Sequence, residues 1–261
     1  MEKETLTSHA AAPDVVALRQ FYSSALGRKV KERLRRMLHG RVRAAQGEIT
    51  VGLGYATPLL RSFEESGEIN SPAIVLMPAP QGAMYWPVMR DNRAALCDMH
   101  VLPLHDNTVH HIVMMHVLEH TENPLAMLVE CWRVLVPGGR MYMLVPRAAR
   151  VWRSIGATPF RSGKSYTPRA LHSLLREAEF TIVESRGLLG APPSQHPLML
   201  RAWRSMEWLI SLLAPALGSA MLVEVEKQIY AAIRQPARML SAKKVATAQT
   251  AAASSSKEIA S

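Results

Sequence analysis

Histidines are concentrated in one short stretch of this chain. Five of the ten fall within sixteen residues, at His105, His110, His111, His116 and His120. Histidine is the commonest metal ligand and a natural proton carrier near neutral pH. The segment from His116 to His120 also matches H-x-x-E-H, the inverted zinc-protease pattern. That pattern binds zinc only when both histidines lie on one face of a helix.

The residues around this motif instead predict a strand, a loop and a helix. Ile112 to Met115 form a short apolar run, and Asn123-Pro124 is typical of a helix start. Apolar residues then recur at helical spacing, at Leu125, Leu128, Cys131, Trp132 and Leu135. The motif therefore lies in a strand-to-helix loop, and we expect no metal site.

A second strand is predicted directly after this helix. Pro137-Gly138-Gly139 ends the helix, and Met141 to Val145 are apolar. A strand, a helix and a second strand in this order predict a right-handed βαβ unit of a parallel sheet. Ligands bind at the carboxyl edge of such sheets, which is where the loop from His116 to His120 would lie.

The stretch from Leu102 to Pro146 resembles class I S-adenosylmethionine (SAM)-dependent methyltransferases of the type 11 group. The features that carry the resemblance are a Leu-Pro pair, the HVLEH loop, a helix with E-x-W-R-V-L, and PGGR. Thr50 to Leu60 fall where that family has its glycine-rich first loop. With this upstream segment included, the resemblance extends from Ile49 to Leu188. It implies an α/β, Rossmann-like fold, with a mostly parallel sheet, helices on both faces, and SAM as cofactor.

The same resemblance implies a set of site residues. Asp98 and Met99 would meet the adenine ring, and His116 would border the cofactor. His120 is the first candidate for a general base, with Glu119 and Tyr166 as further candidates. The remaining cofactor-binding residues would come from the first loop, at Gly52, Leu53, Gly54 and Tyr55.

Two departures from the family pattern keep other functions open. The loop positions that are usually glycine or acidic read Gly52, Gly54, Ala56 and Pro58, and no acidic residue follows the second apolar run. The preferred function is methyl transfer to an unidentified small or amphipathic acceptor. The alternatives are a non-catalytic methyltransferase-like scaffold and a protein that binds polyanions such as RNA or anionic lipid.

Composition and charge set the outer limits. The two cysteines, Cys97 and Cys131, lie in segments predicted to be buried, so they indicate neither a disulfide framework nor a zinc cluster. The first residues lack the apolar core of a signal peptide, which favours a cytoplasmic protein. The net charge is +10, and Arg28 to Arg43 contain eight Lys and Arg residues against Glu32 alone. Such a basic helix attracts anionic surfaces, including the periphery of a membrane.

The predicted organisation has five parts. A flexible N-terminus (1–13) precedes a helical cap (14–45), in which Gly27 is a candidate break, and the Rossmann-like domain (46–190). A C-terminal helical addition (191–236) follows as a hairpin of two helices, around Met199 to Leu213 and Ala220 to Ile233, and a disordered tail (237–261) ends the chain. The apolar stretch from Trp208 to Val223 is shorter than the ~20 residues that span a bilayer and contains Pro215, so no transmembrane helix is expected.

Overall fold

The computed structural model of this chain describes residues 12–88, 90–148, 152, 158–194, 196–213 and 218–228. Most of the predicted flexible N-terminus and all of the predicted disordered tail lie outside these residues. The sheet contains seven strands, which are β1 (Thr50–Gly54), β2 (Ile74–Pro78), β3 (Ala94–Cys97), β4 (Val109–Met115), β5 (Leu135–Pro146), β6 (Thr181–Leu188) and β7 (Ala220–Glu226).

The strand order is β3-β2-β1-β4-β5-β7-β6. The first five strands along the chain are mutually parallel, and β7 runs antiparallel between β5 and β6. Val51 of β1 pairs with Ile74 on one side and with Ile112 of β4 on the other. The chain progresses outward in opposite directions from β1 and β4, so their carboxyl ends form the switch point at which open α/β sheets bind ligands. The predicted mostly parallel sheet is confirmed.

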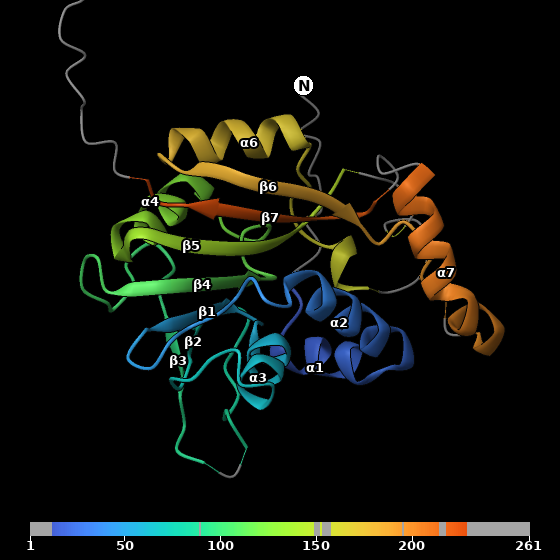
Figure 1. Cartoon of the computed structure of the whole chain (residues 1–261), viewed down its shortest axis with the longest axis horizontal. Helices are drawn as coiled ribbons and strands as arrows, with labels where there is room; N and C mark the ends of the chain where they lie inside the picture. The colour runs from blue at the N-terminus through green and yellow to red at the C-terminus, as the bar shows by residue number, and fades with distance from the viewer. Residues whose placement is uncertain are drawn as a thin grey trace, which may run out of the picture. The chain divides into compact units, whose positions relative to one another are not determined.

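Helices cover both faces of the sheet, as Figure 1 shows. They are α1 (Val15–Ser23), α2 (Ala25–Leu38), α3 (Thr57–Glu65), α4 (Pro124–Val134), α6 (Pro168–Glu177) and α7 (Pro197–Leu213), with a 3-10 turn η1 at Pro159–Arg161. Alternate residues of β4 enter two separate cores. Val113 and Met115 pack with side chains of α1, α2 and α3, whereas Ile112 and Met114 pack with those of α4 and α6.

The βαβ unit forms as the sequence predicts. Asn123 caps α4, because its Oδ1 accepts a hydrogen bond from the Ala126 N–H at 3.1 Å, and Pro124 occupies the first turn. Strand β5 already begins at Leu135, so the Pro-Gly-Gly segment bends within the strand instead of preceding it. Gly138 has a φ of +77°, which a side chain at this position would disfavour.

The predicted C-terminal helical hairpin is wrong in its second half. Residues 220–226 form β7, a central strand that is buried along nearly its whole length. The periodicity of a continuous apolar run does not distinguish a buried strand from a buried helix. Here the segment forms a strand because it pairs with β5 on one side and β6 on the other. The N-terminal helical cap also divides at Ser24 and not at Gly27, since the Ser24 hydroxyl accepts from the Gly27 N–H and caps α2.

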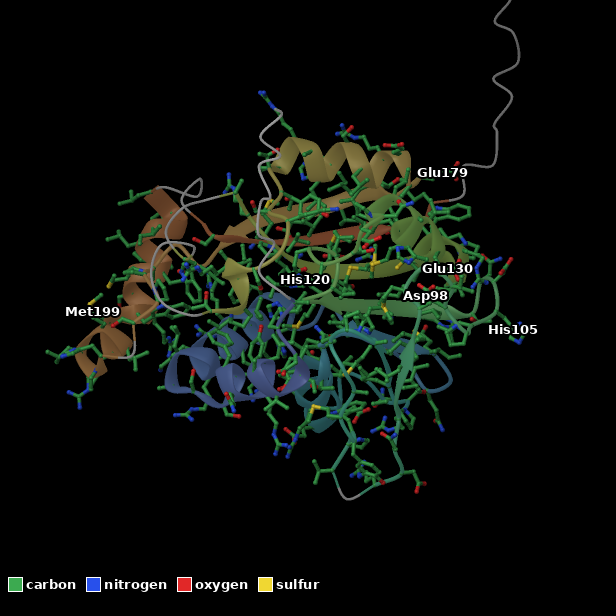
Figure 2. All side chains as sticks on the ribbon, turned by 180° about the vertical axis from the view of Figure 1, so that it is seen from behind. Asp98, His105, His120, Glu130, Glu179 and Met199 are labelled. Carbon is green, nitrogen blue, oxygen red and sulfur yellow. The ribbon has the colours of Figure 1, made fainter. Side chains whose placement is uncertain are left out.

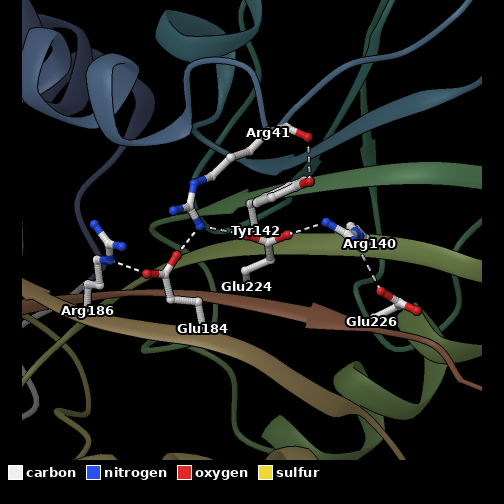
Figure 3. Close-up of polar contacts among 7 residues, drawn as sticks. All are labelled: Arg41, Arg140, Tyr142, Glu184, Arg186, Glu224 and Glu226. Atoms are coloured by element: carbon white, nitrogen blue, oxygen red, sulfur yellow. Dashed lines mark hydrogen bonds and ion pairs between the residues drawn. The ribbon is translucent and has the colours of Figure 1, made fainter.

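An ion-pair network fastens the end of the helical cap to the antiparallel part of the sheet (Figure 3). The buried Glu224 carboxylate accepts from Arg41 at 3.0 Å and from Arg140 at 2.8 Å. Arg41 also pairs with Glu184, which in turn pairs with Arg186. Burial alone would raise the pKa of Glu184, but the two guanidinium groups lower it. The ion pairs therefore compensate for the hydration that these charged groups lose on folding.

Removing the carboxylate of Glu224 should destabilise this connection. Glu224→Gln leaves Arg41 and Arg140 without their shared counter-ion, and we expect a loss of about 3 kcal/mol in the free energy of unfolding, measured with urea. The control is Glu65→Gln, which removes an exposed ion pair to Arg61 and should cost less than about 1 kcal/mol. Equal losses in the two variants would contradict this account.

Candidate functional site

A cavity of about 600 Å³ opens at the carboxyl ends of β2, β3 and β4. Three loops form most of its wall, which are those after β2 (Pro78 to Gln81), β3 (Asp98 to His100) and β4 (His116 to Glu122). Ala12, just before α1, completes the lining. The cavity thus lies beside the switch point, at the sheet edge where the sequence places a ligand.

The wall that follows β3 carries a carboxylate with a fixed orientation. Asp98 Oδ1 accepts from the His100 backbone N–H at 2.8 Å and lies 2.9 Å from His100 Nδ1. These contacts lower the pKa of Asp98, so it is ionised at neutral pH. Both contacts end on Oδ1, which leaves Oδ2 for an N–H or O–H donor from a ligand. His100 Nε2 lies 3.0 Å from the Thr121 hydroxyl and so ties this loop to the one after β4.

The loop after β4 begins with a buried histidine in an unusual backbone conformation. His116 is 1% exposed and has a φ of +56°. Its Nε2 lies 2.8 Å from the Tyr22 hydroxyl, and its Nδ1 lies 3.3 Å from Glu119 Oε1. Burial raises the pKa of Tyr22 well above its usual value, so the phenol keeps its proton and can donate to Nε2. Nδ1–H then faces the Glu119 carboxylate, which assigns the tautomer from the network.

Gln81 holds the same histidine from the loop after β2. Its side-chain N–H donates to the His116 carbonyl at 2.8 Å. The other end of the amide, Oε1, is buried and has no hydrogen-bond partner among the described residues. Gln81 lines the cavity and is 2% exposed, so this oxygen is a buried acceptor without a protein partner beside the cavity.

His120 lies farther along the same loop and lines the cavity. Burial lowers the pKa of its imidazole, which is therefore neutral at physiological pH. Its Nε2 is buried and has no partner within the described part of the chain. Gly163 packs against the ring, since a Cβ there would lie 2.8 Å from His120 Cε1. A neutral imidazole nitrogen without a partner is chemically able to accept a proton.

The predicted site residues divide into two groups. Asp98, Met99, His116 and His120 come together around the cavity. Gly52, Leu53 and Gly54 are buried in β1 and do not line it, and neither does Tyr55. Gly54 has a φ of +68°, and a Cβ there would lie 2.3 Å from the Met115 carbonyl oxygen. The absence of a side chain at Gly54 therefore allows β1 and β4 to lie close together here.

Aromatic packing closes the space above this part of the sheet. Tyr55 stacks on Tyr22 of α1 at 5.7 Å between ring centroids, and Phe160 lies 5.1 Å from the His116 ring. Tyr55 is 3% exposed. The first loop is therefore covered by the helical cap, and the open volume lies on the side of β2 and β3.

The remaining candidates take structural positions. Tyr166 donates to the Leu118 carbonyl at 3.2 Å and supports the loop, and Glu119 faces His116. His110 and His111 lie in β4, and His105 lies at the opposite end of that strand from His120 (Figure 2). Cys131 is buried as predicted, whereas Cys97 is only partly buried and lines the cavity. Sequence reasoning missed Gln81, His100 and Thr121, because loop polar residues give no signal without their partners.

One family model matches part of the chain. A family model described as a methyltransferase domain, of the type 11 group, matches residues 83–143. No curated protein sequence matches the chain. The matched segment contains β3, β4, α4 and most of β5, and so includes the cavity loops that follow β3 and β4.

Solved structures share the fold at low sequence identity. A chain of the complex between the Haloferax volcanii Trm112 methyltransferase activator and the putative methyltransferase has a TM-score of 0.56 and 15% identity, covering 81% of this chain and 98% of that one. Geranyl diphosphate C-methyltransferase from Streptomyces coelicolor A3(2) has a TM-score of 0.54 and 12% sequence identity, and the match covers 84% of this chain and 86% of that one. A SAM-dependent methyltransferase from Mesorhizobium loti has a TM-score of 0.53 and 13% sequence identity, and the match covers 77% of this chain and 99% of that one.

The fold is thus that of class I methyltransferases. The matched segment, residues 83–143, adds a similarity in sequence to the methyltransferase-domain family of the type 11 group. The cavity residues fit the nucleoside half of SAM, because Asp98 can accept from an amino group and Leu96 and Pro78 offer apolar contacts. The position after β2 has no carboxylate for ribose hydroxyls, but the unpartnered Gln81 Oε1 supplies a buried acceptor on that side.

The buried Tyr22 hydroxyl should stabilise the fold through His116. Tyr22→Phe leaves His116 Nε2 buried without its partner, so we expect unfolding in urea to require about 1–3 kcal/mol less free energy. Tyr85→Phe is the matched control, since it removes a hydroxyl that donates to the Arg90 carbonyl from a ring 58% exposed. That variant should change the free energy by less than about 0.5 kcal/mol. An unchanged stability of Tyr22→Phe would show that the contact contributes nothing.

Proposed function

We propose that the chain binds SAM in the cavity formed by the loops after β2, β3 and β4, and methylates a small or amphipathic acceptor there. The observation that carries this proposal is the convergence of Asp98, Gln81 and His120 on one cavity at the switch point. The lining combines these polar groups with apolar side chains such as Leu96, Met99 and Val117. Such a surface suits an acceptor that is itself partly apolar.

The cofactor would be held mainly from the side of β2 and β3. Asp98 Oδ2 would accept from the adenine amino group, and the Met99 backbone N–H would face the ring. Gln81 Oε1 would accept from a hydroxyl or ammonium group, and His116 would border the cofactor. In this proposal Gly52, Leu53, Gly54 and Tyr55 act indirectly, by fixing the strand and loop from which these contacts are made.

His120 would act as the general base. SAM, when bound, supplies a methyl group already activated by the sulfonium. His120 Nε2 would take the proton that the acceptor oxygen or nitrogen loses when it is methylated. The low pKa of this imidazole keeps it in the neutral form that can take the proton. Fixing donor and acceptor in line would supply the rest of the acceleration.

A non-catalytic scaffold is the second candidate function, and one specific observation favours it. The stacked rings of Tyr22 and Tyr55 occupy the space above the first loop, where the sequence placed part of the cofactor. If the cavity holds no SAM, the sheet serves only as a frame for the helical cap and its basic surface. Measurement of SAM affinity separates the two functions.

The carboxylate of Asp98 should be needed for SAM affinity. By calorimetric titration, Asp98→Asn should bind SAM at least about tenfold more weakly than the natural chain, because a charge-assisted hydrogen bond becomes a neutral one. Asp91→Asn is the matched control, since Asp91 is exposed and lies outside the cavity. Absence of SAM binding to the well-folded natural chain would refute the proposal and favour the scaffold.

The acceptor class and the base can be tested together. Radiolabelled SAM incubated with cell lysate, then separated into lipid, RNA, protein and small-molecule fractions, identifies the acceptor class. With that fraction as substrate, His120→Asn should reduce kcat by roughly 10²–10⁴-fold. His105→Asn, at the far end of β4, should leave kcat unchanged.

The pH profile adds an independent check of the base. His120 must be neutral to act, and burial places its pKa below the ordinary value of about 6.5. The activity of the natural chain should therefore fall only as the pH drops below about 6.5. The His120→Asn variant should lose this acid limb, and a limb that persists in the variant would assign the titration to another group.

A further inference from the structure

The helices α2 and α7 enclose a second hollow, of about 610 Å³, away from the cavity described above. Four arginines line it, Arg33 and Arg36 from α2 and Arg201 and Arg204 from α7. The other lining residues are Trp203, Ser205, Glu207 and Trp208. We refer to the hollow and the outer face of α7 beside it as the α2–α7 surface.

Most of the positive charge of this surface has no carboxylate partner among the described residues. Glu207 is 2% exposed, and its two oxygens accept from the backbone N–H groups of Leu189 at 2.7 Å and Ala191 at 2.9 Å. It therefore anchors α7 to the chain after β6. Glu32 forms an ion pair with Arg36 at 3.6 Å. Arg33 Nε is buried and has no hydrogen-bond partner among the residues that the structure describes.

The outer face of α7 continues this basic region with large apolar side chains. Leu200, Trp203, Met206 and Ile210 face the core and leave the opposite face to solvent. On that face Trp208 is 61% exposed, Leu212 63% and Leu213 72%. Scattered single apolar residues are normal on a surface, but a cluster within two turns of one helix marks an interaction site.

We propose that the α2–α7 surface docks the protein on an anionic membrane. The arginines would contact lipid phosphates, and Trp208, Leu209, Leu212 and Leu213 would enter the boundary between headgroups and acyl chains. Among the described residues no helix is long and apolar enough to cross a bilayer. The combination of arginine and leucine favours a membrane over a nucleic acid, because exposed leucine side chains gain no favourable contact from a nucleic-acid backbone.

A second copy of the chain is a poorer occupant. A symmetric contact would place the same four arginines opposite one another, which costs free energy. An anionic leaflet instead supplies negative charge and an apolar layer together. Membrane binding is independent of methyl transfer, so failure of either proposal leaves the other standing.

Vesicle flotation with the full-length chain tests the proposal. The protein should float with vesicles of equal parts phosphatidylcholine and phosphatidylglycerol, not with phosphatidylcholine alone, and added salt should weaken the binding. The double variant Arg201→Gln/Arg204→Gln should bind roughly thirtyfold more weakly. Arg169→Gln/Arg176→Gln is the charge-matched control, since both arginines are exposed on α6, and it should lose far less.

The apolar contribution needs a separate variant. Leu212→Ser/Leu213→Ser changes only exposed side chains, so folding, checked by circular dichroism, should be intact while vesicle binding weakens at least about tenfold. Equal losses in the α6 control, binding that ignores lipid charge, or no binding of the natural chain at low salt would overturn the proposal. Stronger binding to RNA than to anionic vesicles, unaffected by the leucine changes, would overturn it too.

Discussion

The loop after β4 depends on a buried histidine whose backbone adopts a left-handed conformation. Contacts with three different parts of the chain stabilise this strained conformation. They join His116 to Tyr22 in α1, to Gln81 after β2 and to Glu119 in its own loop. These contacts fix the helical cap, the sheet edge and the cavity wall in one arrangement. The site residues Asp98 and His120 have their positions because this arrangement is held.

The same cluster explains why the cavity opens on the β2 and β3 side. In a parallel sheet, the carboxyl ends of β1 and β4 offer space for a ligand at the switch point. Here the stacked rings of Tyr22 and Tyr55 take the space above β1, and the open volume moves toward Gln81 and Asp98. Tyr55 and Ala56, the two residues that follow β1, are both buried by this packing.

Basic residues that look alike in the sequence have different roles in the fold. Arg41 and Arg140 are paired with Glu224 and hold the cap to the sheet. Arg133 is likewise paired with Glu130 and Asp106. Arg33 and Arg36 instead border the hollow beside α7, next to Arg201 and Arg204. The basic residues of the described chain are therefore divided between ion pairs within the fold and exposed positions such as those of the α2–α7 surface.

The sequence alone determined the βαβ unit, the parallel sheet and the position of the His116 to His120 loop at its edge, because caps, turn residues and periodicity are local signals. Asp98 was placed at the same edge through the family resemblance. The tertiary structure decided that residues 220–226 form a strand, because a short apolar run is compatible with either element until it has neighbours. It alone revealed Gln81 and the aromatic cover over β1, since such contacts join residues far apart in the chain. Which arginines remain exposed was decided in the same way, by the carboxylates that folding brought to the others.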